Sequence, residues 1–98
     1  MMKSKAVNDL AAEVEARTLN LIDVREADEF AEGHLPGAIN LPLSDFLERY
    51  GELDKDKSYH IICRSGARSA QACAFLEEEG YDVTNVAGGT IAWMGDLE

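Results

Sequence analysis

The residues best suited to chemistry lie together in one short segment, residues 63–69, which reads Cys63-Arg64-Ser65-Gly66-Ala67-Arg68-Ser69. The apolar run 59–62 before it predicts a strand, and the stretch after it predicts a helix. A thiol between a strand end and a helix N-terminus lies near backbone N–H groups that have no helical partner. Such groups favour an anion, so they lower a thiol pKa and hold a negatively charged adduct. The segment therefore predicts that Cys63 is a nucleophile.

Positive charge is concentrated beside this thiol. Arg64 and Arg68 are the only Lys or Arg residues between Ser58 and Glu98, in a chain with 9 Lys and Arg against 19 Asp and Glu and a formal net charge of −10. In so acidic a chain, two cations next to a candidate nucleophile favour the binding of a small anion. Gly66 permits a tight turn around that anion. The candidate binding loop comprises Arg64, Ser65, Gly66, Ala67, Arg68 and Ser69.

A simpler interpretation gives this segment no chemistry. Cys63 would complete the strand as a small buried hydrophobe, and Arg64 and Arg68 would be solvated or paired with surface carboxylates. For an isolated cysteine this interpretation would be preferred. Here a nucleophile, a turn glycine, unpaired amides and two cations share one short segment, and this combination favours a site.

Predicted helices and strands alternate along the chain and determine where this loop can lie. Elements joined in this way favour one α/β domain with a mainly parallel central sheet flanked by helices on both faces. Ligands of such sheets bind beyond the carboxyl ends of the strands, which places residues 23–25 near Cys63. The sequence predicts strands at 19–24, 38–41, 59–63 and 81–86, and helices near 10–14, at 25–32, 44–50 and 67–79, and after Gly88-Gly89.

Length and charge restrict the class of protein. With 98 residues, 46% of them hydrophobic, we expect one domain over residues 1–98. The net charge of −10 repels phosphate backbones and anionic lipid headgroups, so we expect neither nucleic acid nor a membrane as partner. No apolar run approaches the roughly 18 residues of a membrane span, and the first ten residues lack a signal peptide. We expect a cytoplasmic protein, and Leu97-Glu98 resembles the residues that a cloning site leaves behind.

The other residues that could do chemistry have structural interpretations. Cys73 lies among apolar residues of a predicted helix and is expected to pack in the core, although a bridge to Cys63 is conceivable; two cysteines without an export signal favour reduced thiols. His34 lies in a Gly-Pro turn and is expected to bond to nearby backbone, and His60 is expected to be half-buried. No Cys/His spacing suits zinc, so we expect no metal and no cofactor. Trp93 is expected to anchor the last helix.

Three motifs, in order along the chain, resemble those of the single-domain rhodaneses, the thiosulfate sulfurtransferases. The first is Leu21-Ile22-Asp23-Val24-Arg25-Glu26 with Phe30, followed by Gly33-His34-Leu35-Pro36-Gly37-Ala38-Ile39-Asn40. The second is the loop from Cys63 to Ser69, and the third is Val86-Ala87-Gly88-Gly89 with Trp93. The resemblance runs from about Val7 to Trp93.

This resemblance implies an activity. The Cys63 thiolate would take the outer sulfur of thiosulfate, release sulfite, and pass the sulfur from a persulfide to cyanide or a thiol acceptor. Arg64 and Arg68 would neutralise the charge of the substrate, and a pair of arginines favours doubly charged thiosulfate over mercaptopyruvate. Of the two, Arg68 beside Ser69 matches the cation of the family's loop. Asp23 and Arg25 match the family's Asp-x-Arg element, with a supporting role as a pair at the strand ends.

Two other functions stay open at this point. A persulfide carrier or binding module would accept sulfur for a partner protein without free turnover of thiosulfate. A phosphatase or arsenate reductase on the same scaffold is disfavoured, because Cys63 and Arg68 enclose four residues, as in the sulfurtransferases, whereas the related cell-cycle phosphatases enclose five.

Overall fold

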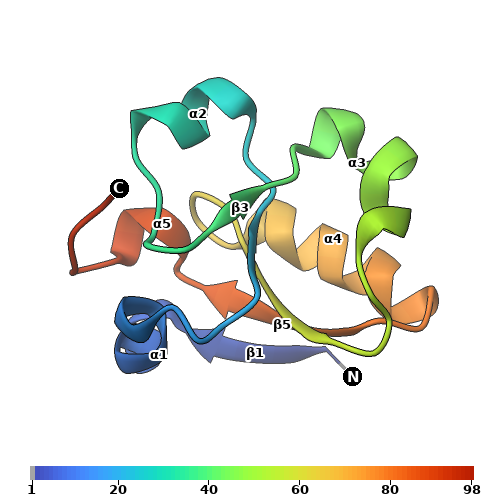
Figure 1. Ribbon diagram of the computed structural model, residues 1–98, viewed down its shortest axis with the longest axis horizontal. Helices are drawn as coiled ribbons and strands as arrows, with labels where there is room; N and C mark the ends of the chain where they lie inside the picture. The colour runs from blue at the N-terminus through green and yellow to red at the C-terminus, as the bar shows by residue number, and fades with distance from the viewer. Residues whose placement is uncertain (1) are drawn as a thin grey trace.

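A five-stranded sheet forms the centre of the computed structural model, which describes residues 2–98 (Figure 1). The strands lie in the order β1-β5-β4-β2-β3, and each neighbouring pair is parallel. The predicted α/β class with a parallel sheet is therefore confirmed. Because β2 lies beside β4, the two strand ends that carry the candidate residues are neighbours. The strands are β1 (Lys3–Ala6), β2 (Leu21–Asp23), β3 (Ile39–Asn40), β4 (Ser58–Ile62) and β5 (Asp82–Ala87).

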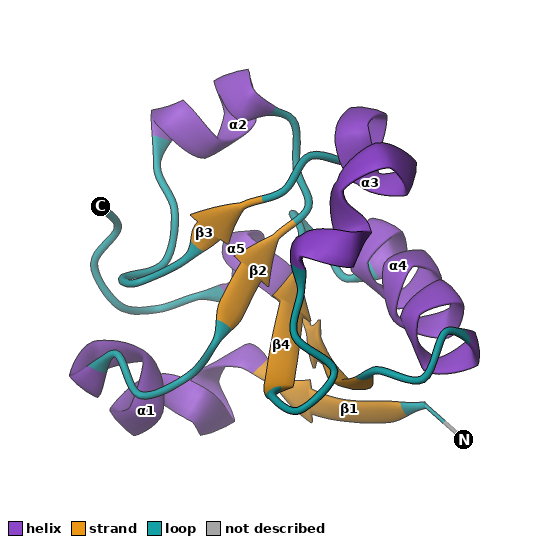
Figure 2. Ribbon diagram, turned by 45° about the vertical axis from the view of Figure 1, so that its right-hand side comes forward, coloured by secondary structure: helices purple, strands orange, loops and turns teal. Residues whose placement is uncertain are grey.

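Helices cover both faces of the sheet, since successive strand residues point to opposite sides. In β4, Ile61 belongs to an apolar cluster with Phe46 and Leu76, whereas Ile62 belongs to a second cluster with Val14 and Trp93. Figure 2 shows α3 and α4 on one side of the strands and α1 on the other. The helices are the 3-10 turn η1 (Val7–Leu10), α1 (Ala11–Ala16), α2 (Ala27–Glu32), α3 (Leu43–Arg49), the 3-10 turn η2 (Tyr50–Glu52), α4 (Ala67–Glu78) and α5 (Gly89–Ala92).

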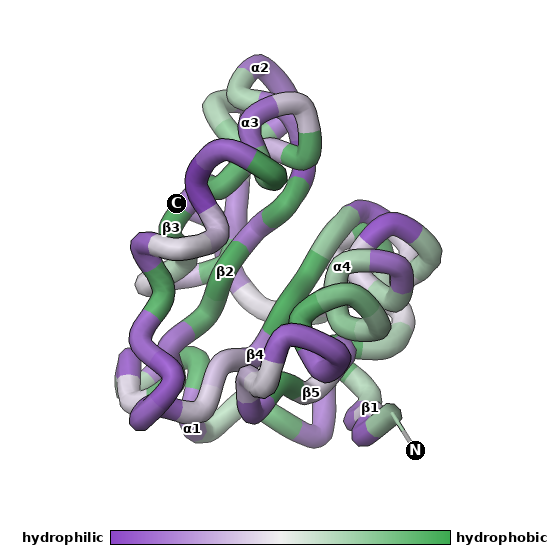
Figure 3. The backbone as a smooth tube through the Cα atoms, turned by 90° about the vertical axis from the view of Figure 1, so that its right-hand side faces the viewer, coloured by the Kyte–Doolittle hydropathy of each residue, from purple (hydrophilic) through white to green (hydrophobic). Residues whose placement is uncertain are grey.

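The edge strand β1 is the element that the sequence analysis did not predict. All four of its residues are exposed, and it pairs with β5 at the margin of the sheet. The strand predictions depended on apolar residues, which mark β2 and β4 clearly along the backbone (Figure 3). An exposed Lys-Ser-Lys-Ala edge lacks that signal, and its lysines are typical of edges that resist pairing with other chains.

One helix boundary differs from its prediction in a way that affects the site. The helix predicted at 25–32 begins at Ala27, because Glu26 is its N-cap and forms a capping box with Glu29. Arg25 therefore lies outside the helix, and its side chain is buried. The helix predicted at 44–50 begins one residue earlier than predicted.

Candidate active site

Cys63 follows β4 directly, and only 1% of its surface is exposed. The backbone N–H of Gly66 donates to its sulfur at 3.1 Å, and the Ser69 hydroxyl lies 3.3 Å from the same atom. Gly66 is the N-cap of α4 with a φ of +105°, a conformation that favours glycine. The turn thus brings the N-terminus of α4 onto the thiol. Ser65 is exposed on the loop, and Ala67 begins the helix.

These donors change the acidity of the thiol. Burial raises the pKa of Cys63, but the Ser69 hydroxyl and the backbone N–H groups of Ser69, Gly66 and Ser65 together outweigh it, so the pKa lies below its ordinary value. The same hydrogen bonds stabilise a negative charge on sulfur after the thiol has lost its proton. The loop therefore favours a nucleophilic thiolate.

Asn85 is a residue of this site that the sequence analysis missed. It lies in β5, and the Ser69 hydroxyl donates to its Oδ1 at 2.6 Å, while its Nδ2 donates to the Gly66 carbonyl at 3.4 Å. Asn85 thereby ties the first turn of α4 to the sheet. Ser69 has one hydroxyl proton, which it can direct to Asn85 or to the sulfur. Asn85 lies two residues after Val83, on the same face of the strand, and a polar residue at that position of the apolar face was the available signal.

Arg68 points to a carboxylate of α2. Its guanidinium donates to both oxygens of Glu29, at 2.7 and 2.9 Å. The hydrogen bond with Arg68 is the largest cause that lowers the pKa of Glu29, to about 2, although burial partly opposes it. Arg68 thus fastens α2 to the catalytic loop. The sequence analysis assigned its charge to the substrate and did not single out Glu29.

Arg64 is placed differently. It is exposed, and within residues 2–98 its side chain makes no hydrogen bond or ion pair. It lines a hollow of about 300 Å³ that lies between α2 and α5. Of the two loop arginines, Arg64 is therefore the one whose charge faces solvent beside Cys63.

Asp23 and Arg25 pair with one another, as expected for the ends of the strand. Arg25 donates to both carboxylate oxygens of Asp23, at 2.8 to 3.1 Å, and both side chains are buried. The guanidinium also donates to the carbonyls of Glu29 and Gly33. The pair thus anchors α2 to the end of β2, through a carbonyl in the first turn of the helix and the carbonyl that follows its last residue. Its role in the structure is to position α2 beside the loop.

The first turn of α5 packs on the backbone of Cys63 and Arg64. The N–H of Thr90 donates to the Cys63 carbonyl at 2.9 Å, and the N–H of Ile91 donates to the Arg64 carbonyl at 3.0 Å. A Cβ atom on Gly89 would lie 2.6 Å from the Cys63 carbonyl oxygen, so this contact requires glycine. The Gly88-Gly89 motif therefore has a physical reason in the close approach of two backbones.

The family comparison matches this arrangement. The model of the rhodanese-like domain covers residues 6–96. The chain belongs to the rhodanese-like domain family.

A sulfurtransferase of Allochromatium vinosum is 49% identical over 74 residues, which span 74% of this chain and 69% of that protein. The thiosulfate sulfurtransferase GlpE of Shewanella oneidensis is 34% identical over 92 residues, which span 93% and 91%. The crystal structure of a rhodanese-like domain protein from Staphylococcus aureus is 36% identical and has a TM-score of 0.88, covering 99% of this chain and 97% of that one. Sulfur transfer is the broad activity that these relatives support.

The remaining cysteine and histidines of this rhodanese-like domain lie in structural positions. Cys73 is a free thiol in the core, where burial raises its pKa to about 12. His34 stacks on Phe30, and its Nδ1 lies 2.9 Å from the Phe30 carbonyl. Burial lowers the pKa of half-buried His60. Trp93 ends α5 and packs in the second apolar cluster, with its indole N–H donating to Asp96.

Two kinds of feature are absent from the part of the chain that the structure describes. Within residues 2–98, no three His, Cys, Asp or Glu side chains are grouped so as to hold a metal ion. None of the helices in that range is long and apolar enough to cross a membrane.

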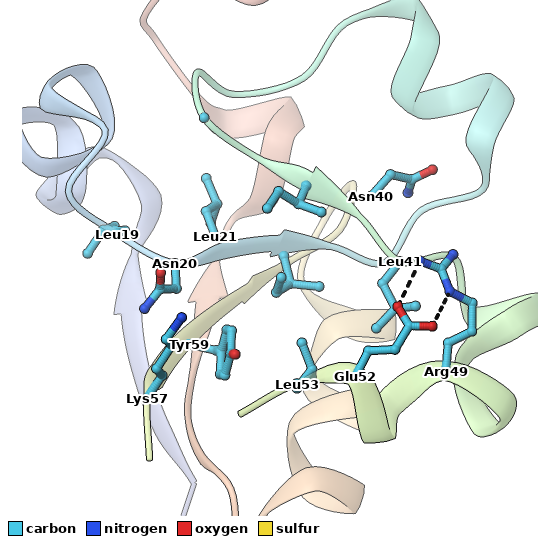
Figure 4. A pocket seen from close by; sticks show the side chains of 13 residues that line it. Leu19, Asn20, Leu21, Asn40, Leu41, Arg49, Glu52, Leu53, Lys57 and Tyr59 are labelled. Carbon is cyan, nitrogen blue, oxygen red and sulfur yellow. Dashed lines mark hydrogen bonds and ion pairs between the residues drawn. The ribbon is translucent and has the colours of Figure 1, made fainter. Parts of the chain in front are cut away.

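A second hollow, of about 280 Å³, runs along β2 and β3 (Figure 4). It reaches from Leu19 and Asn20, just before β2, to Asn40 and Leu41 at the end of β3. Neither Cys63 nor the groups that bond to its sulfur line it. Ligands of parallel sheets bind at the carboxyl ends, so we place the candidate site of the rhodanese-like domain at Cys63.

Proposed function

We propose that this chain is a thiosulfate sulfurtransferase that carries sulfur on Cys63 as a persulfide and delivers it to cyanide or to a thiol. The observation that carries the proposal is the pair of groups at the Cys63 sulfur, the Gly66 N–H, which donates to it at 3.1 Å, and the Ser69 hydroxyl, which lies 3.3 Å from it. They stabilise negative sulfur before the reaction, as a thiolate, and after it, as a persulfide anion. The family relation supports sulfur transfer as the reaction class.

In the first step the Cys63 thiolate attacks the outer sulfur of thiosulfate. A new S–S bond forms, the S–S bond of thiosulfate breaks, and its electron pair leaves with sulfite. The charge balances, because the thiolate and the doubly charged donor become a persulfide anion and doubly charged sulfite. The outer sulfur then lies about 2 Å beyond the Cys63 sulfur, toward the surface.

In the second step an acceptor takes the outer sulfur. Cyanide bonds to it directly and leaves as thiocyanate, and the electron pair of the broken S–S bond returns to Cys63. A thiolate acceptor attacks the protonated persulfide in the same way and leaves as a new hydropersulfide. Both routes restore the Cys63 thiolate, so the cycle needs no oxidant or reductant.

Arg64 is the residue that we assign to the negative charge of the donor. Its guanidinium is exposed beside the nucleophile, whereas Arg68 already faces the Glu29 carboxylate. This assignment differs from the expectation that Arg64 and Arg68 both neutralise the charge of the substrate, with Arg68 as the cation of the family's loop. One guanidinium still favours a compact doubly charged donor.

Intact mass measurement after treatment with thiosulfate tests the proposal. The wild type and Cys73→Ala should each gain one sulfur atom, and Cys63→Ala should gain none. Steady-state kinetics with thiosulfate and cyanide should then be ping-pong, because sulfite leaves before the acceptor reacts.

Three results would contradict the proposal. Sulfur on Cys73 would assign a different nucleophile. A stable persulfide without turnover would indicate a carrier that serves a partner protein. Hydrolysis of an aryl phosphate that is lost in Cys63→Ser would indicate a phosphatase.

A further inference from the structure

The hollow of about 300 Å³ beside Arg64 shares a wall with the catalytic loop. Thr90, one of its lining residues, donates both its N–H and its hydroxyl to the Cys63 carbonyl. The C-terminal end of α2 forms the opposite wall with Glu29, Glu32 and Gly33. The hollow therefore adjoins the loop through Arg64 and the backbone of Cys63 through Thr90.

The charged residues of the hollow differ in what they offer to a ligand. Arg25 is paired with buried Asp23, and Glu29 is paired with Arg68. Arg64 and Glu32 are both exposed, and within residues 2–98 neither side chain has a hydrogen-bond or ion-pair partner. A ligand thus meets one open guanidinium and one open carboxylate.

Apolar side chains complete the lining. Ile91 of α5 is 64% exposed and Leu97 is 51% exposed, and both belong to the wall of the hollow. Aliphatic groups of a ligand can pack on them while its charged groups reach Arg64 and Glu32. The combination of one cation, one anion and an aliphatic wall matches a small zwitterion.

We propose that this hollow binds the sulfur acceptor, and that the acceptor is a small thiol with both an ammonium and a carboxylate group, such as free cysteine. Arg64 binds the carboxylate, Glu32 binds the ammonium group, and the thiol faces the persulfide on Cys63. The inference rests on the proposed function, because it names the acceptor class of the same site.

The carboxylate of Glu32 distinguishes the acceptor from the donor. Thiosulfate carries two negative charges, so Glu32 repels it and opposes its binding. Sulfite leaves before the acceptor enters a ping-pong cycle, so Arg64 is free again for the carboxylate of the thiol. Arg64 thus serves both half-reactions in turn, and Glu32 serves the second.

A single-turnover experiment with four thiols tests this inference. The persulfide is formed with thiosulfate, excess donor is removed, and the transfer rate is measured for cysteine, cysteamine, 3-mercaptopropionate and 2-mercaptoethanol. These thiols carry both charges, the ammonium group only, the carboxylate only, and no charge. Each variant is compared with the wild type for the same thiol, so that the intrinsic reactivity of each thiol cancels.

Glu32→Gln should slow transfer to cysteine and cysteamine by about two- to fivefold and spare 2-mercaptoethanol, as expected for a solvent-exposed ion pair. Arg64→Gln should slow transfer to cysteine and 3-mercaptopropionate by a similar factor. Glu48→Gln, which removes an exposed carboxylate on α3 away from the hollow, is the matched control and should behave as the wild type for all four thiols.

The outcomes separate this inference from the proposed function. Equal effects of Glu32→Gln on all four thiols, or no effect on any, would overturn the acceptor class while leaving the persulfide and its transfer to cyanide intact. Transfer to cyanide with no transfer to any of the four thiols would also overturn it. If the proposed function is wrong, the first step of the experiment fails, because thiosulfate forms no persulfide on Cys63. The proposed acceptor site would then be wrong as well.

Discussion

Cys63 and Cys73 belong to the same buried apolar cluster, yet the pKa values of the two thiols are shifted in opposite directions. Burial raises the pKa of both. For Cys73 it dominates, and the pKa rises to about 12, whereas at Cys63 the hydroxyl and amide donors reverse the direction. Cys73 lies within α4, whose backbone amides bond along the helix, and Cys63 lies in front of its first turn, where they do not. The comparison shows that the hydrogen-bond donors at the helix end, rather than burial, set the direction of the pKa shift of Cys63.

The largest expected effect comes from replacing the two cysteines separately. Cys63→Ser should lower thiosulfate:cyanide turnover by about a thousandfold or more, since the covalent step is lost. Cys73→Ser should retain turnover, although it places a hydroxyl in the core and lowers the melting temperature. Steady-state rates together with thermal melts check both statements. An equal loss of turnover in the two variants would contradict the difference in role between the two cysteines.

The pH dependence of alkylation should show the same contrast in the wild type. At neutral pH, Cys63 should react with iodoacetamide at least about a hundredfold faster than Cys73, because thiolate is the reactive form. Reactivity of Cys63 should rise with pH to a midpoint below that of an ordinary thiol, and Cys73 should stay protected until the protein unfolds. Peptide mass mapping of time points at each pH measures both rates, and a Cys63 midpoint above the ordinary value would contradict the pKa direction.

Ser69→Ala should shift the pKa of Cys63 upward, in the direction of the pKa of Cys73. Removing the hydroxyl deletes one donor to the sulfur, so the pKa of Cys63 should rise and kcat/KM for thiosulfate should fall by about fivefold at neutral pH. Raising the pH should recover part of the loss, which a general loss of folding would not do. Thr84→Ala, on the same strand as Asn85 but outside this hydrogen-bond network, is the control.

The smallest expected effect concerns Arg68, which the structure pairs with Glu29 rather than with the thiol. Glu29→Gln should destabilise the fold by about 1 kcal/mol, the scale of a partly exposed ion pair. The folded pKa of Glu29 is about 2 against an ordinary 4.5, so its pairing stabilises the fold fully above the ordinary value, and this contribution is lost as pH falls toward 2. Denaturant unfolding of both proteins between neutral pH and acid should show the difference shrink, and a constant difference would contradict the pairing.

Several parts of the fold and the site were predictable from the sequence because their signals are local. Apolar runs mark β2 and β4, and alternating apolar residues mark β5. The loop 63–69 is contiguous, so Cys63, Gly66 and Ser69 must lie near one another. The exposed edge strand β1 was not predictable in this way, because it lacks the apolar pattern on which the other strand predictions relied.

The sequence by itself thus determined the fold class and the position of Cys63 at the end of a strand. Only the tertiary structure decided which groups surround it, because these come from segments far apart in the chain. Asn85 reaches Ser69 across 16 positions, and Glu29 reaches Arg68 across 39. The sequence near a charged or polar side chain does not specify its partner, because the partner depends on how strands and helices pack. The pairing of Arg68 with Glu29 and the exposure of Arg64 therefore became evident only in the folded protein.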